Sequence, residues 1–262
     1  MYQHHLESIE KLKAYFAPTP GIIALVLGGS VAKGNERPDS DLDALVILTD
    51  EAYAEKAAQG KTAETVHGHC TYEGGYFDVK YMTKDYIKAA AQRGSEPTRN
   101  SFVKARVLFS SDPEIDQLVP QIGVFQTQER EDKMLSFMGN YRLNHNYFIR
   151  ACKADHYLRL RAVSEILYSI YRMILQENEI LFPCNRRLEE TVQKAPHKPE
   201  NIVELGRKAA ETLADEDLDA FAKAYFDWTT WQFPTEHSVI LARYVADFEQ
   251  WWYQPRPLVG EW

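Results

Sequence analysis

The sequence predicts an α+β protein, in which a small mixed β-sheet with flanking helices is followed by an all-α helical bundle. Before about residue 125, short apolar runs alternate with turn residues, a pattern that is typical of strands. After Gln126 the apolar residues recur at the spacing of a helix instead. We therefore predict two domains, residues 1–125 and residues 126–262.

Four apolar runs are the expected strands of the sheet, and they span residues 22–27, 42–48, 76–82 and 106–109. A helix is expected to open after the first run, and residues 50–59 form a second helical stretch. The first domain therefore combines strands with helices that can cover them.

Three apolar stripes predict helices in the second domain. They consist of Met134, Met138, Tyr141, His145, Phe148 and Cys152; of Val163, Ile166, Leu167, Ile170 and Ile174; and of Leu241, Tyr244, Phe248 and Trp252. Asp215 and Thr235 are expected to cap the starts of later helices. Aromatic side chains at helical spacing usually belong to a core, so no site is assigned to the late tryptophans, which are Trp228, Trp231, Trp251, Trp252 and Trp262.

Composition and charge exclude several functional classes. With 45% apolar and 26% charged residues the chain is expected to fold, and no apolar run approaches the roughly 20 residues that span a bilayer. The N-terminal residues show no basic region followed by an apolar stretch, so we expect a cytoplasmic protein without a membrane partner. The net charge of −8 argues against binding of duplex nucleic acid, which requires clustered Lys and Arg, and favours a small substrate.

Three cysteines, Cys70, Cys152 and Cys184, are too far apart to form metal-ligand pairs and are expected to be structural thiols.

Gly28, Gly29 and Ser30 follow the first expected strand and open a helix. Adjacent glycines let the backbone approach a ligand closely, and a helix start directs free N–H groups and a positive dipole end at that ligand. The hydroxyl of Ser30 adds a donor at the same place. We therefore expect these residues to bind phosphate. Lys33, Glu36 and Arg37 in the same loop are further candidates for contact with the triphosphate, although exposed loop charges are usually solvated.

Asp41 and Asp43 lie two residues apart at the start of the next strand, so their side chains are expected on one face while Leu42 and Ala44 turn into the core. Two carboxylates in a half-buried site repel each other unless a cation binds them. Mg²⁺ prefers oxygen ligands and bridges to phosphates, so the pair is predicted to bind metal. Asp39 and Ser40 are expected to shape the preceding loop.

Asp78 interrupts an otherwise apolar strand, and Lys80 shares its face. Three carboxylates on neighbouring strands suit a two-metal transfer of a phosphoryl or nucleotidyl group. Lys80 is then expected to offset charge on the bound phosphates. Whether Asp78 is a metal ligand or the general base stays open.

These motifs resemble the nucleotidyltransferase superfamily typified by DNA polymerase beta, which includes kanamycin and lincosamide nucleotidyltransferases as small-substrate members. The family signature of a hydrophobic residue, glycine and serine, then two aspartates about ten residues later and a third acidic residue, is matched by Gly28-Gly29-Ser30, Asp41-Leu42-Asp43-Ala44 and Asp78. The resemblance covers about residues 20–110.

The resemblance implies a polymerase beta-like fold and a metal-dependent transferase. Such an enzyme would transfer a nucleoside monophosphate to a hydroxyl of a small molecule and release pyrophosphate. The first candidate for the transferred group is AMP, with ATP as its donor. The implied cofactors are two Mg²⁺ ions, with ATP or another nucleoside triphosphate as co-substrate, and antibiotics are among the candidate acceptors. The helical second domain is expected to bind the acceptor, while the acceptor, the base preference and the oligomeric state stay open.

Two alternatives remain at this point. Arg150 and His156 resemble the Arg–His pair of helical ribonuclease domains found beside minimal nucleotidyltransferases. The first domain could instead be a catalytically silent nucleotide-binding regulator or antitoxin-like module, although the presence of all three aspartates argues against this.

Overall fold

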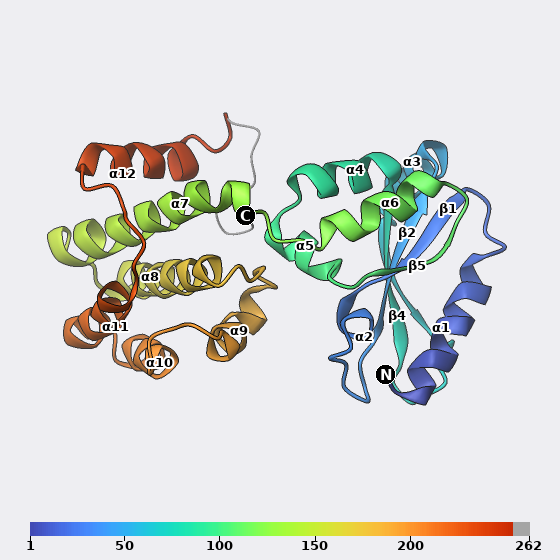
Figure 1. Ribbon diagram of the computed structural model, residues 1–262, viewed down its shortest axis with the longest axis horizontal. Helices are drawn as coiled ribbons and strands as arrows, with labels where there is room; N and C mark the ends of the chain where they lie inside the picture. The colour runs from blue at the N-terminus through green and yellow to red at the C-terminus, as the bar shows by residue number, and fades with distance from the viewer. Residues whose placement is uncertain (254–262) are drawn as a thin grey trace. The chain divides into compact units, whose positions relative to one another are not determined.

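The structure, a computed structural model, describes residues 1–253 and divides the chain into two compact units. The first unit comprises Met1–Val124, and the second begins at Phe125 (Figure 1). The first unit is built around a sheet and the second consists of helices, which is the predicted fold class.

The sheet of the first unit has five strands in the order β3-β4-β2-β1-β5. Their bounds are β1 Ile22–Leu27, β2 Leu42–Leu48, β3 Ala63–His67, β4 Tyr76–Thr83 and β5 Arg106–Ser110. The β2–β4 pair is parallel and the other pairs are antiparallel, so the sheet is mixed, as predicted. The sequence pattern did not reveal β3, because this edge strand is mostly exposed and lacks an apolar run.

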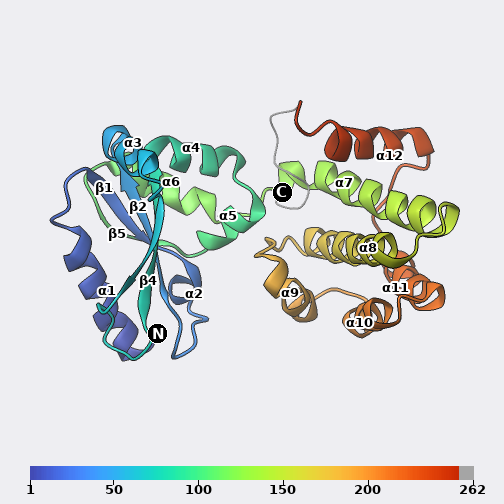
Figure 2. The ribbon, with the colours of Figure 1, turned by 180° about the vertical axis from the view of Figure 1, so that it is seen from behind.

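Helices cover both faces of this sheet (Figure 2). They are α1 Gln3–Phe16, α2 Gly29–Lys33, α3 Asp50–Ala58, α4 Lys84–Arg93, α5 Glu96–Ser101 and α6 Pro113–Ile122. One buried cluster joins Leu12 of α1 to Leu42 and Ala44 of β2, whereas Leu45 belongs to a second cluster with residues of α4 and α6, among them Ile87. Successive side chains of β2 point to opposite faces of the sheet, so this strand contributes residues to the apolar core on each face.

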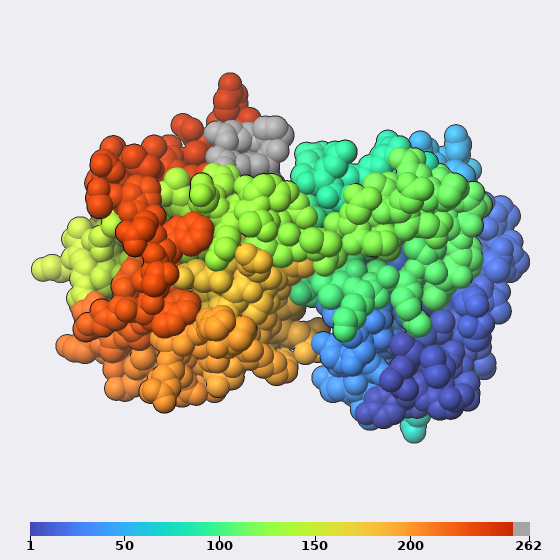
Figure 3. Space-filling model, viewed as in Figure 1, coloured from blue at the N-terminus to red at the C-terminus, as the bar shows by residue number. Residues whose placement is uncertain are grey.

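The second unit packs around α8, which spans His156–Glu177 and is buried at every residue from 169 to 176. Its other helices are α7 Arg130–Arg142, α9 Leu188–Lys194, α10 Ile202–Thr212, α11 Asp215–Trp228 and α12 His237–Tyr244. Short 3₁₀ turns lie at η1 Thr127–Glu129 and η3 Asn185–Arg187, and α7 and α12 continue into the π-helical segments η2 Leu143–Ala151 and η4 Val245–Glu249. The connection from α11 to α12 crosses the surface of this unit (Figure 3).

The first predicted stripe is correct along α7 and only partly correct beyond it, where Phe148 still packs against the core. Met134 and Met138 are buried, but Cys152 is exposed and Ile149 is buried in its place. A π-helix has i→i+5 hydrogen bonds, so η2 turns a different set of side chains inward from that expected at α-helical spacing. The second stripe, from Val163 to Ile174, is buried as predicted.

The third stripe is correct at Phe248, which packs against the core, and is shifted at other positions. Ile240 is buried while Leu241 is 40% exposed, and Trp252 is 71% exposed. The predicted caps are displaced by one residue, because Ala214 precedes α11 and Glu236 precedes α12. Trp262 lies outside the described residues.

Within residues 1–253, no helix combines the length and the apolar character needed to cross a membrane.

Candidate functional site

The predicted site residues of β2 and β4 lie on one face of the sheet. The parallel register places Asp43 opposite Asp78 and Leu45 opposite Lys80. Leu42, between the two aspartates of the motif, is fully buried on the opposite face. The structure therefore brings Asp43, Asp78 and Lys80 together as the alternation of the strands predicts.

Negative charge exceeds positive charge at this point of the sheet. The ammonium of Lys80 lies 2.8 Å from Asp78 Oδ2 and 3.8 Å from Asp43 Oδ1. Burial and the charges of Asp41 and Asp78 raise the pKa of Asp43, although Lys80 and Lys33 act in the opposite direction. Two lysines thus do not compensate the carboxylates fully.

Lys80 itself is held in its charged form. Burial acts to lower the pKa of its ammonium, but the hydrogen bond to Asp78 and the charges of Asp43 and Asp41 outweigh burial and raise it. The side chain is therefore a permanent positive charge between the carboxylates.

Tyr76 is a site residue that the sequence reasoning missed. The charge of Asp41 and a hydrogen bond to its carboxylate raise the pKa of the Tyr76 phenol, which consequently remains protonated and available as a donor. Tyr76 precedes Asp78 by two residues on the same strand, so the period of the strand could have identified it.

The glycine turn lies directly against Asp43. Gly28 caps the start of α2 and its N–H donates to the carbonyl of Asp43 at 3.0 Å. Gly29 has φ +65°, and a Cβ placed on it would lie 1.6 Å from Asp43 Oδ2. A Cβ on Gly28 would lie 2.9 Å from the carbonyl oxygen of Ser101. Both glycines are required by this packing, whatever ligand they bind.

Ser30 and Lys33 belong to the short helix α2. The carbonyl of Ser30 accepts from the N–H groups of Gly34 and Asn35, and the side chain is partly exposed. The ammonium of Lys33 donates to Asn100 Oδ1 of α5 at 2.6 Å. Nothing in the sequence indicated Asn100, because it is 67 residues from Lys33.

The three aspartates fit a divalent cation by their chemistry. Asp41, Asp43 and Asp78 offer carboxylate oxygens, which Mg²⁺ prefers. Burial, and after it the charges of Asp41 and Asp78, raise the pKa of Asp43, and a bound cation would favour the charged carboxylate. Their side chains do not form a finished cage, since the described part of the chain contains no set of three or more His, Cys, Asp or Glu positioned to hold a metal.

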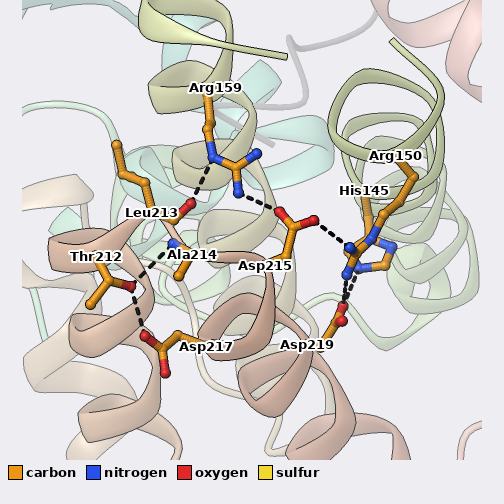
Figure 4. A network of polar contacts seen from close by, with 9 residues as sticks. All are labelled: His145, Arg150, Arg159, Thr212, Leu213, Ala214, Asp215, Asp217 and Asp219. Carbon is orange, nitrogen blue, oxygen red and sulfur yellow. Dashed lines mark hydrogen bonds and ion pairs between the residues drawn. The ribbon is translucent and has the colours of Figure 1, made fainter. Parts of the chain in front are cut away.

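The Arg–His pair of the ribonuclease alternative has separate surroundings. Arg150 donates to Asp215 and Asp219 of α11, and His145 also contacts Asp219 (Figure 4). The side chain of His156 is 93% exposed, with Asp155 as its ion-pair partner. Arg150 therefore belongs to a structural network, and the structure gives no support to a shared catalytic role with His156.

One family model matches part of the chain. Residues 8–108 match the family model of the nucleotidyltransferase domain, and this segment contains both glycines and all three aspartates. No curated protein matches the sequence significantly.

Solved structures also resemble the chain. A nucleotidyltransferase-like protein from Exiguobacterium sibiricum is 12% identical, with a TM-score of 0.43, and the match covers 95% of this chain and 80% of that one. A spectinomycin adenyltransferase from Enterococcus faecialis, solved with ATP and spectinomycin, is 13% identical, with a TM-score of 0.32 and coverages of 91% and 96%. At these TM-scores neither likeness bears on the function of this chain.

Proposed function

We propose that this chain transfers a nucleoside monophosphate from a nucleoside triphosphate to a hydroxyl of a small molecule, because residues 8–108 match the family model of the nucleotidyltransferase domain. In the reaction the acceptor oxygen forms a bond to the α-phosphorus, the bond from that phosphorus to pyrophosphate breaks, and the hydroxyl proton leaves. We propose ATP as the donor. The observation that carries the proposal is the uncompensated carboxylate group at Asp43, which suits a metal–triphosphate complex.

Each site residue has a role in this proposal. Asp41 and Asp43 would hold two Mg²⁺ ions, which would offset the charge of the triphosphate and of the leaving pyrophosphate. Asp78 either completes this set of ligands or accepts the proton of the acceptor hydroxyl.

The remaining residues contact the nucleotide. Gly28, Gly29 and Ser30 bind the triphosphate through backbone N–H groups and a hydroxyl. Lys80 lies within reach of two of the aspartates, so its ammonium can also pair with phosphate oxygens.

We propose that the helical unit binds the acceptor. A hollow of about 540 Å³ in this unit is lined by Glu131, Leu135, Thr230, Trp231, Gln232, Phe233 and Pro234. Its volume lies within the range of roughly 300–1,000 Å³ that small-molecule pockets occupy, and it combines aromatic faces with polar groups that can orient a ligand. A second hollow, beside Leu143 and Tyr147, has about 200 Å³ and is smaller than that range.

The test is an incubation with labelled ATP, Mg²⁺ and a panel of aminoglycosides, lincosamides and other hydroxylated metabolites, with pyrophosphate release as the readout. We expect label transfer by the wild-type protein and a loss of at least about 100-fold in Asp43→Asn, because the substitution removes a charged metal ligand but keeps the shape of the side chain.

Equal turnover by wild type and Asp43→Asn would overturn the assignment of the site, and absence of nucleotide binding by the wild type would overturn the function. Nucleotide binding without transfer to any acceptor would favour the regulatory alternative instead.

A further inference from the structure

The loop that carries Asp41 into β2 is fastened by side chains from distant parts of the first unit. Tyr72 donates its hydroxyl to the carbonyl of Ser40 at 2.5 Å, and Nε2 of His5 lies 3.2 Å from the same oxygen. His4 Nε2 contacts the carbonyl of Pro38 at 2.9 Å. Three ring side chains therefore contact two carbonyls immediately ahead of the first aspartate of the motif.

The N–H, the hydroxyl oxygen and the carbonyl of Ser40 each take part in a hydrogen bond. Its N–H donates to the carbonyl of Arg37 and its hydroxyl accepts from the N–H of Arg37, while its carbonyl accepts from Tyr72 and His5. A carbonyl has two lone pairs, so this acceptor is saturated. Ser40 is 8% exposed, and a buried residue with every polar group bonded has few alternative positions.

His5 and Tyr72 both carry the proton that a hydrogen bond to the Ser40 carbonyl requires. A carbonyl oxygen can only accept, so His5 must carry its proton on Nε2, and its Nδ1 is buried without a hydrogen-bond partner among the described residues. Burial lowers the pKa of His5 and thereby favours the neutral ring. Burial also raises the pKa of the Tyr72 phenol, which keeps its hydroxyl proton.

The same part of α1 also holds the chain that leads to β4. The N–H of Thr71 donates to the Ser8 hydroxyl at 3.0 Å, and the Thr71 hydroxyl donates to the carbonyl of His4 at 3.0 Å. The Tyr72 ring packs against this region, tilted towards His4 at a centroid distance of 4.6 Å and edge-on to His5 at 5.0 Å. The first turns of α1 thus tie together the approaches to both aspartate-bearing strands.

We propose that His5 and Tyr72 are positioning residues, which set the placement of Asp41 for cation binding by fixing the carbonyl of Ser40. The proposal rests on the proposed function, because it assigns Asp41 to a metal. Of the two proposed positioning residues, Tyr72 lies within residues 8–108, the segment matched by the family model, and His5 precedes it.

The primary test is Tyr72→Phe, which removes the hydroxyl that donates to Ser40 and is hydrogen-bonded to the Cys70 thiol, and keeps the ring. His5→Phe removes the second donor. Tyr15→Phe is the matched control. Tyr15 lies on α1, as His5 does, and within residues 1–253 the structure gives no hydrogen bond to the Tyr15 hydroxyl. Two measurements are made on the full chain, Mn²⁺ binding by electron paramagnetic resonance and hydrogen exchange of peptides that cover residues 37–42.

We expect Tyr72→Phe to weaken Mn²⁺ binding about two- to tenfold, the size of one net hydrogen bond, and to accelerate exchange in residues 37–42 but not in β1. His5→Phe should act in the same direction, and Tyr15→Phe should match the wild type in both measurements. The Mg²⁺ concentration needed for half-maximal transfer should rise more than kcat falls.

Unchanged Mn²⁺ affinity in Tyr72→Phe would overturn the proposal, even if exchange in the loop became faster, since the bonds would then serve only the fold. Absence of Mn²⁺ binding by the wild type would instead overturn the proposed metal site. Hydrogen exchange would still show whether the two donors hold the loop, so the two failures are distinguishable.

Discussion

Each unit contains a cluster of charged side chains, and the two clusters differ in their charge balance. In the helical unit, Asp215 accepts from Arg150 and Arg159, and Asp219 accepts from Arg150 and His145 (Figure 4). Every carboxylate of this network has a cationic or ring N–H donor. The carboxylates of Asp215 and Asp219 are therefore paired within the protein and need no ligand to balance their charge.

In the sheet unit the cluster has a surplus of carboxylates. Asp41, Asp43 and Asp78 face Lys80, and Lys33 acts on Asp43 from a neighbouring helix. Carboxylates that share a partly buried site destabilise one another unless a cation enters.

The pKa directions express this difference. Burial together with the neighbouring aspartates raises the pKa of Asp43. Burial also acts to raise the pKa of Asp219, but hydrogen bonds from Arg150 and His145 outweigh it, and the pKa falls below its ordinary value. The carboxylate with the raised pKa thus lies in the cluster that has few cationic partners, and the carboxylate with the lowered pKa lies in the cluster whose hydrogen bonds and ion pairs are complete.

The largest expected effect comes from the same substitution made in both clusters. Asp78→Asn should lower nucleotidyl transfer at least about 100-fold, because it removes charge that the metal–triphosphate complex requires. Asp219→Asn should leave transfer within about twofold of the wild type, because its carboxylate serves the helical network. Steady-state rates at saturating ATP and Mg²⁺ decide between them. Equal losses in the two variants would remove the distinction between the clusters.

A smaller effect is expected from alanine at two glycines of similar backbone conformation. Gly29 has φ +65° and Gly60 has φ +67°, so either substitution strains the backbone by about 1–2 kcal/mol. Only at Gly29 does the added Cβ meet a side chain, the carboxylate of Asp43, whereas nothing lies within 4 Å at Gly60. We expect both variants to lose unfolding free energy, with the larger loss at Gly29.

The two glycine variants should also differ in nucleotidyl transfer activity. Gly29→Ala should abolish most transfer by displacing Asp43, and Gly60→Ala should retain it. Denaturant unfolding and transfer rates are both measured, and a Gly29→Ala protein with wild-type activity would contradict the close packing of this turn against Asp43.

The smallest effect concerns the stability of the helical unit. The folded-state pKa of Asp219 is below its ordinary value of 3.8, so its pairing stabilises the fold above pH 3.8 and this contribution is lost as pH falls through the folded-state pKa. The side chain is 52% exposed, so we expect the contribution to be below about 1 kcal/mol. Asp219→Asn should therefore melt at a slightly lower temperature than the wild type at pH 7, and this difference should become smaller towards pH 2.

Calorimetric scans at both pH values, with Lys223→Gln as a control for an exposed ion pair, measure this difference. A gap in melting temperature that widens towards acid would have the wrong sign for the lowered pKa of Asp219.

Local pattern predicted much of the first unit. The apolar runs located β1, β2, β4 and β5, and the two-residue period placed Asp43, Asp78 and Lys80 on one face. Such inferences succeed because strand alternation depends on neighbours along the chain. The same reasoning failed at β3, where an edge strand has too little buried surface to leave an apolar pattern.

In the helical unit the period alone was less reliable. The apolar stripe of α8 was predicted correctly, whereas the stripe that begins in α7 loses its phase in η2. The apolar spacing of the sequence did not indicate the change from α-helical to π-helical hydrogen bonding at Leu143–Ala151.

The composition, the strand periods and the spacing of the glycine and aspartate motifs were sufficient to predict the fold class and to nominate the site. The contacts that surround those motifs required the folded chain. Lys33 meets Asn100 and His5 meets Ser40 across 67 and 35 residues respectively, and the carboxylate of Asp43 occupies the space that a Cβ on Gly29 would need. Contacts at such separations are set by how the elements pack in space, whereas the periods read along a sequence record only which side of each element is buried.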